Sequence, residues 1–124
     1  MSWSPDDLTR IGRAEELQIS SHRDDGSLRP YITIWVVRSG NELFVRSASS
    51  AGNGWYRRAL ASGTGSIRAG GVERAVTFER EDDAALNAAI DAEYHKKYDR
   101  YGPRIVGSVV GDAAHTVTVR LNAA

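Results

Sequence analysis

The longest run of strand-forming residues lies near the middle of the chain. Residues 31–38 (YITIWVVR) are β-branched or aromatic almost throughout, and this pattern predicts a central strand that is covered on both faces. Residues 39–41 (SGN) have the composition of a tight turn, so residues 42–47 (ELFVRS) are expected to return as the partner strand of a hairpin. The pattern therefore predicts an antiparallel hairpin at the centre of the fold.

Shorter apolar runs on either side of this hairpin predict the remaining strands. Residues 66–69 and 72–80 flank a Gly-Gly pair, which is typical of a second hairpin. The polar residues 21–30 are expected to form a connecting loop or a wide hairpin. Three further strands are predicted, at residues 17–20, 105–110 and 114–121.

Two short helices are predicted from their start and stop signals. Ser4 can cap a helix that has Pro5 in its first turn and ends near Gly12. Residues 55–61 (WYRRALA) predict another, which Gly63 ends.

A longer helix is expected from Asp82 to about Tyr101. Asp91 lies off its apolar face and is expected to face solvent, so that alanine there costs roughly 0.5 kcal/mol or less. The apolar face itself repeats every four residues: Leu86, Ile90, Tyr94 and Tyr98.

The order of these elements favours an antiparallel barrel. Six or seven short strands are joined by tight turns, whereas a parallel sheet needs a helix after nearly every strand. The chain carries no internal repeat or low-complexity tract. We therefore predict one domain, residues 1–124, that is mainly β with flanking helices: an antiparallel barrel with one long helix.

Composition narrows the classes of function. The 124 residues carry 16 basic and 16 acidic side chains, so partners such as nucleic acid or an anionic membrane surface are not expected. The chain has no cysteine, and its three histidines lack the HxH and HExxH spacings, so no metal site is predicted. There is no signal-peptide pattern and no apolar stretch near the roughly 20 residues that span a bilayer, so a cytoplasmic location is expected.

Motifs of hydrolytic enzymes are missing from the sequence. There is no GxSxG elbow, and the three Asp-Asp pairs are typical of helix caps and turns. No catalytic acid–base pair is therefore predicted.

The strongest candidate site is the stretch between a strand end and the second helix, residues 46–58 (RSASSAGNGWYRR). Backbone N–H groups, hydroxyls and guanidiniums in this arrangement suit a phosphate, and a neighbouring tryptophan can cover an aromatic ring. The alternative is a connecting loop with a buried tryptophan and solvated arginines, and composition favours neither. The residues predicted to bind the ligand are Arg46, Ser47, Ser49, Trp55, Arg57 and Arg58.

A second candidate is residues 93–101 (EYHKKYDRY), where basic residues alternate with tyrosines, a mixture that base stacking and phosphate contacts can use. Tyr94 and Tyr98 belong to the apolar helix face, however, and Glu93 and Asp99 offset the positive charge. Packing is therefore favoured over ligand binding in this segment.

Several of these segments together resemble a known family. Residues 29–37 (RPYITIWVV), 42–47 (ELFVRS), 54–61 (GWYRRALA) and 94–98 (YHKKY) are similar to the uncharacterised bacterial family called domain of unknown function 2255. That family is placed among flavin-binding split barrels, similar to pyridoxamine phosphate oxidase. The resemblance implies that the barrel is a split β-barrel.

Within that larger group, residues 23–61 resemble the deazaflavin-dependent nitroreductases, which carry a Gly-Arg-Lys-Ser-Gly-x-x-Arg turn and a Trp-Tyr helix. Asp24 replaces the lysine of the turn and His22 its first glycine, which removes positive charge for a cofactor phosphate or polyglutamate tail. Arg57 and Arg58 can restore part of this positive charge. The cofactor that the resemblance implies is FMN or the deazaflavin coenzyme. The residues that match the two motifs are Arg23, Gly26, Arg29, Trp55, Tyr56 and Ala61.

The resemblance implies a flavin- or deazaflavin-dependent oxidoreductase of a small molecule, in which the cofactor carries the hydride chemistry. Two alternatives stay open: a non-enzymatic module that binds flavin or another metabolite, and a cofactor-free dimeric interaction module. A homodimer is expected, because three Trp and five Tyr exceed what a barrel of this size needs inside. In such folds the flavin lies at the dimer cleft.

Overall fold

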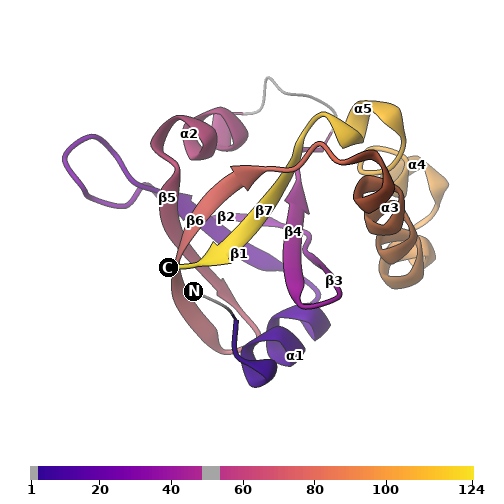
Figure 1. Ribbon diagram of the computed structural model, residues 1–124, viewed down its shortest axis with the longest axis horizontal. Coiled ribbons are helices and arrows are strands. Elements are labelled where there is room, and N and C mark those ends of the chain that lie inside the picture. Colours follow the sequence, from indigo (N-terminus) through magenta and orange to yellow (C-terminus); the bar gives the residue numbers. More distant parts are fainter. Residues whose placement is uncertain (1–2, 49–53) are drawn as a thin grey trace.

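The computed structural model describes residues 3–48 and 54–124, which form one antiparallel seven-stranded sheet with flanking helices (Figure 1). Its strands lie in the order β2-β1-β5-β6-β7-β4-β3, and every neighbouring pair is antiparallel. The strands are β1 (Leu17–Ser21), β2 (Ile32–Ile34), β3 (Val37–Ser39), β4 (Glu42–Arg46), β5 (Thr64–Ala69), β6 (Val72–Arg80) and β7 (Thr118–Ala123).

The connection between β2 and β3 shows that this sheet closes into a barrel. The two strands form opposite edges of the sheet, yet β2 ends at Ile34 and β3 begins at Val37. Three residue steps span roughly 10 Å, whereas the edges of a flat seven-stranded sheet would lie roughly 29 Å apart. The sheet must therefore curl until its edges meet, and the prediction of an antiparallel barrel is confirmed.

The expectation of one central strand over residues 31–38 is wrong. The segment breaks at Trp35 and Val36 into two three-residue edge strands. The strand that is buried on both faces is β4, with Leu43 and Val45 in the barrel core and Phe44 packed outside it.

Helices lie around this barrel, and two of them begin at the capping residues that the sequence predicts. Ser4 caps α1 by accepting a hydrogen bond from the Asp7 N–H at 3.1 Å, and Asp83 caps α3 by accepting one from the Leu86 N–H at 2.8 Å. Figure 1 shows α1 and α2 at opposite ends of the barrel and the later helices grouped along one side. The helices are α1 (Pro5–Arg13), α2 (Gly54–Ser62), α3 (Ala84–Tyr98), the 3-10 helix η1 (Asp99–Tyr101), α4 (Pro103–Val106) and α5 (Asp112–His115).

The predicted strand at residues 105–110 is also wrong, because this segment holds the end of α4 and a turn. Its buried residues, Val106 and Val109, lie three positions apart, which matches a helical turn rather than strand alternation. The last strand likewise begins later than predicted: α5 occupies Asp112–His115, and β7 starts at Thr118.

Apolar side chains gather in two separate clusters. The larger cluster fills the barrel and includes the inward residues of all long strands. The second, here called the outer cluster, lies between α3, α4 and the outer face of β3 and β4. Its buried members are Val37, Phe44, Ile90, Tyr94, Tyr98, Val106 and Val109.

Candidate functional site

An open groove of about 380 Å³ runs beside β2, at the edge of the barrel. Ile32, Ile34 and Trp35 form one wall, while Trp55 and Ile105 contribute other parts of its apolar lining. The groove also meets Glu16, Thr33, Arg46, Ala48, Ser108 and Val109. Its size and mixed apolar lining suit a flat organic ring.

A crevice of only about 10 Å³, room for one water molecule, adjoins this groove and shares Ile32 and Trp55 with it. It is called the basic pocket below. Two arginines, Arg29 and Arg58, converge on the pocket from different elements. Arg29 lies just before β2, and Arg58 lies on α2. The remaining lining residues are Ile19, Ser20, Ser21, Pro30 and Ala59.

Arg29 has a buried hydrogen-bond donor that no described residue satisfies. Its Nε is buried and has no hydrogen-bond partner among the described residues. The backbone around it is satisfied: its N–H donates to Ser21 O at 3.0 Å, and its carbonyl accepts from the Ser20 hydroxyl. A buried donor without an acceptor costs about 1–3 kcal/mol, so an anion in this pocket would relieve an existing cost.

The two arginines of α2 differ in position. Arg58 is half-buried in the basic pocket, whereas Arg57 is exposed and outside the lining of both cavities. Glycine at position 54 leaves room for Arg58, because a Cβ there would lie 2.6 Å from Arg58 Nη1. The guanidinium of Arg58 therefore folds back toward the start of α2.

Trp55 forms the wall between the groove and the basic pocket. The indole is buried and meets the Tyr56 ring edge-on, with the ring centroids 6.1 Å apart. The Tyr56 hydroxyl donates to Thr116 O at 3.3 Å, which ties α2 to the end of the α5 turn. The structure thus places Trp55 next to any ring in the groove.

The structure places Arg46 in the scaffold, with no N–H left for a phosphate. The side chain leaves β4 toward α3, where it is fully buried and lies over the Tyr94 ring at 5.3 Å. Its Nε donates to Thr118 Oγ1 at 2.9 Å, and its Nη1 donates to Val109 O at 2.8 Å and to Asp91. Its Nη2 donates to Asn87 O at 3.1 Å and to Asn87 Oδ1 at 2.9 Å.

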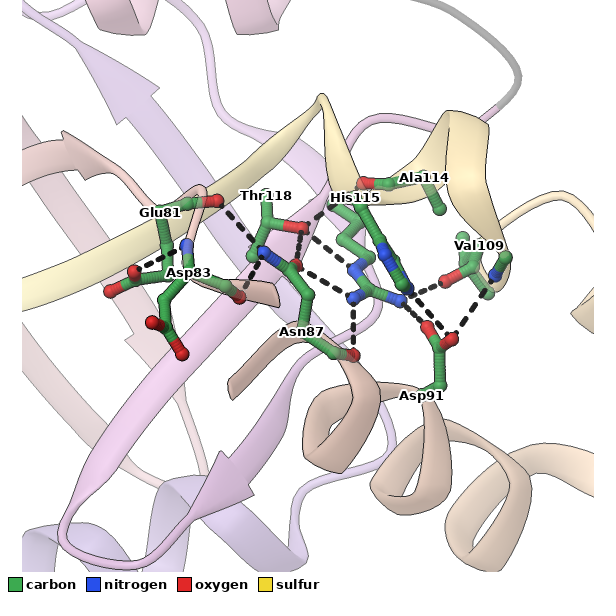
Figure 2. Close-up of polar contacts among 10 residues, drawn as sticks. Glu81, Asp83, Asn87, Asp91, Val109, Ala114, His115 and Thr118 are labelled. Carbon is green, nitrogen blue, oxygen red and sulfur yellow. Dashed lines mark hydrogen bonds and ion pairs between the residues drawn. The ribbon is translucent and has the colours of Figure 1, made fainter. Parts of the chain in front are cut away.

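The partners of Arg46 form a continuous polar network under α3 (Figure 2). Asn87 Nδ2 donates to Glu81 O at 3.2 Å and to Asp83 O at 3.0 Å. Asp91 also contacts His115 Nε2 at 2.8 Å and accepts from the Gly111 N–H at 3.3 Å. Burial raises the pKa of Asp91, but the Arg46 and His115 contacts outweigh it, and the pKa lies below its ordinary value.

The two predicted serines do not add to the described site. Ser47 is fully buried, and its N–H donates to Val117 O at 3.3 Å. Ser49 lies outside the described residues. Trp55, Arg58 and the resemblance-derived Arg29 are therefore the predicted residues that the structure brings together.

Two of the three tyrosines of residues 93–101, Tyr94 and Tyr98, pack in the outer cluster, as favoured from the sequence, whereas Tyr101 is exposed. Tyr94 and Tyr98 are fully buried, and Trp35 stacks on Tyr98 with 4.0 Å between the ring centroids. Lys97 Nζ donates to Val36 O at 2.7 Å. Burial lowers the pKa of Lys97, Glu15 partly opposes this and Arg100 adds to it, so that the pKa is about 8.

Sequence reasoning missed two elements of the groove, Glu16 and Trp35. Trp35 was expected within a central strand, and no motif marked Glu16. The antiparallel register of β1 and β2 pairs Leu17 with Ile34, so one further step sets Glu16 opposite Trp35. Correct pairing of residues 17–20 with residues 31–34 was the signal that could have found them.

Residues 3–48 and 54–124 contain neither a cluster of metal ligands nor a membrane-spanning helix. In these ranges no three His, Asp or Glu side chains gather as metal ligands. Nor do they contain a helix with the length and apolarity required to cross a bilayer.

Comparison with known proteins gives one family match. The family described as "Uncharacterized protein conserved in bacteria (DUF2255)" matches residues 7–121. No curated protein matches the sequence.

Solved structures with the same fold include proteins of several descriptions. The heme storage protein HutZ from Vibrio cholerae is 15% identical, with a TM-score of 0.67 over 100% of this chain and 92% of that chain. A FAD-binding protein from Mesorhizobium loti is 14% identical, with a TM-score of 0.59 over 100% and 92%. A protein described as F420 reductase is 17% identical, with a TM-score of 0.54 over 91% and 87%. These likenesses concern the fold, and the predicted split barrel is confirmed.

Proposed function

Because the chain belongs to the bacterial family DUF2255, as its sequence predicted, we propose that it binds a phosphate-bearing flavin or deazaflavin beside β2. In this proposal the phosphate lies at the mouth of the basic pocket, against Arg29 and Arg58, and the groove holds the ring system. The protein is then an oxidoreductase of a small molecule.

The observation that carries this proposal is the unpartnered Nε of Arg29 next to a ring-sized groove. A phosphate oxygen supplies the acceptor that this buried donor lacks, and a guanidinium can bind two oxygens side by side. Arg58 adds a second cation from the opposite wall.

Flavin fits the described groove better than haem, although one structural neighbour is a heme storage protein. Haem iron takes histidine, cysteine, methionine or tyrosine as its axial ligand. The described lining of the groove includes none of these four residue types. Two structural neighbours, one described as FAD-binding and one as F420 reductase, support a flavin-type ligand rather than haem.

The roles of the chain's own residues follow from their positions. Arg29 and Arg58 bind the phosphate, while Trp55 and Ile32 pack against the ring and exclude water from it. When bound, the cofactor supplies the hydride chemistry. We assign no catalytic acid or base.

A homodimer is part of the proposal. The groove borders the edge strand β2, and its lining residue Ile105 is 51% exposed. A second copy on this edge would cover the rim and enclose the ring. Light scattering should give twice the chain mass of 13.5 kDa, and a mass of 13.5 kDa at micromolar concentration would contradict it.

The test compares FMN with riboflavin, which has the same ring and no phosphate. We expect wild type to bind FMN roughly ten- to a hundredfold more tightly than riboflavin, and Arg29→Ala to remove most of that preference. The deazaflavin coenzyme is titrated in parallel. Binding without turnover of a reduced nicotinamide and an artificial acceptor would favour the non-enzymatic module. If neither cofactor binds, the proposal fails, and a cofactor-free interaction module becomes the better interpretation.

A further inference from the structure

We propose that the small-molecule substrate is a flat cation, a protonated amine or an amidinium, and that Glu16 selects it. This inference rests on the proposed function, because it places the substrate at the end of the groove that lies away from the basic pocket. Glu16 is here a specificity-determining residue.

Glu16 lies at the far end of the groove from the two arginines. It directly precedes β1, whereas Ser20 and Ser21 at the other end of β1 line the basic pocket. Five residue steps along a strand from Glu16 to Ser21 span roughly 16 Å. The site therefore has a positive end and a negative end, and a cation near Glu16 does not compete for the phosphate position.

The carboxylate of Glu16 has no hydrogen bond or ion pair with any described residue. Its neighbour Glu15 is different, because it binds Arg100 at 2.5 Å and accepts a hydrogen bond from the Tyr101 hydroxyl. Arg46 also belongs to the groove lining, but its guanidinium is buried and paired with Asp91. Glu16 is exposed at the groove, and no described side chain is paired with its charge.

Trp35 adds a second feature that attracts cations. The indole lines the same groove as Glu16, and the Tyr98 ring stacks on it at 4.0 Å with an interplanar angle of 4°. This stacking fixes the orientation of the indole. A flat cation between a carboxylate and an indole gains both a charge-assisted hydrogen bond and a cation–π contact.

The test uses three probes of nearly equal shape: benzamidinium, benzamide and benzoate. Their affinities for wild type, Glu16→Gln and Glu93→Gln are measured by ligand-observed NMR at low and high salt. Glu93→Gln removes the same charge from α3, outside the described groove lining. FMN affinity is measured in the same three proteins.

We expect wild type to bind benzamidinium about tenfold more tightly than benzamide, and benzoate most weakly. Glu16→Gln should bring benzamidinium and benzamide within about twofold of each other, while Glu93→Gln should behave as wild type. Equal affinities in wild type, an unchanged preference in Glu16→Gln, or no probe binding at millimolar concentration would overturn the inference. Failure of FMN to bind wild type would overturn the proposed function instead, whatever the probes show.

Discussion

The hydroxyl of Tyr98 bonds to both backbone groups of Val36, with 3.2 Å to its nitrogen and 3.0 Å to its carbonyl oxygen. Val36 is fully buried at the break between β2 and β3, where no neighbouring strand pairs with it. Buried backbone groups need partners. Tyr98 is the acceptor for the Val36 N–H, whereas the Val36 carbonyl also accepts from Lys97 Nζ at 2.7 Å, and the Tyr98 hydroxyl proton can go to Glu15 O at 2.9 Å instead. One tyrosine therefore makes it possible for a strand-forming segment to turn from one edge of the barrel to the other.

We expect Tyr98→Phe to lower the free energy of unfolding by about 1–3 kcal/mol, because it leaves the Val36 N–H without a partner. Phenylalanine keeps the stacking on Trp35, so the loss isolates the hydroxyl. Urea titration measures the change. Tyr31→Phe is the control, since the Tyr31 hydroxyl is exposed and reaches Glu73 only at 3.5 Å. Equal losses in the two variants would contradict this role.

The sequence predicts hairpins and helix ends well, because turn and cap residues act locally. Gly70 and Gly71 adopt positive φ values between β5 and β6, and Ser4 and Asp83 cap their helices as expected. The break at Val36 could not be predicted in this way. It depends on Tyr98, which lies 62 residues later in the sequence.

In the candidate site too, local sequence predicts some residues, whereas the surroundings of others depend on distant parts of the chain. Trp55 and Arg58 belong to one short helix, and both line the basic pocket. Arg46 has the residue type expected at a phosphate site, but its partners Asn87 and Asp91 come from a distant helix. Residue type and local spacing do not reveal such an internal acceptor.

Asp91→Ala should lower the free energy of unfolding by about 2–3 kcal/mol, because it leaves the buried Arg46 guanidinium without its charged partner. This corrects the expectation that Asp91 faces solvent. Only 22% of its side chain is exposed, against 61% for Asp99. Asp99→Ala serves as the control and should cost about 0.5 kcal/mol or less. Similar costs in urea titrations would contradict the importance of the network.

The lowered pKa of Asp91 predicts a loss of stability in acid. A carboxyl with a lower pKa in the folded state stabilises the fold above its unfolded pKa, near 3.8, and loses that contribution as pH falls through the folded value. The difference in unfolding free energy between wild type and Asp91→Asn should therefore shrink below about pH 4. A difference that stays constant down to the pH at which both proteins unfold would contradict this.

Lys97 predicts a gain of stability in base. Its folded pKa is about 8 against an ordinary 10.5, so between these values the unfolded chain holds a proton that the folded chain has released. Stability contributed by this group therefore rises with pH across that window. Urea titrations should show wild type gaining stability relative to Lys97→Met from pH 8 to 10.5. Lys96→Met leaves Lys97 in place, so its stability should change with pH as that of wild type does. Parallel stability curves for all three proteins would refute the prediction.

The two arginines of α2 allow a sharper test of cofactor binding than either gives alone. Arg58 lines the basic pocket and Arg57 does not, although both side chains carry the same charge one residue apart. Arg58→Ala should weaken FMN binding by roughly ten- to a hundredfold, because a charge-assisted hydrogen bond is lost. Arg57→Ala should change the affinity by about twofold or less, since an exposed charge is screened by solvent.

The double variant separates local contact from general charge. If Arg58 alone contacts the phosphate, Arg57→Ala combined with Arg58→Ala should bind FMN about as weakly as Arg58→Ala by itself. Arg58→Lys should recover only part of the affinity, because lysine lacks the planar fork that bonds two oxygens at once. Isothermal titration gives these affinities, and thermal unfolding checks that each variant is folded. Equal losses from the two single variants would mean that the helix acts only through its net charge, and the basic pocket would then not be the phosphate site.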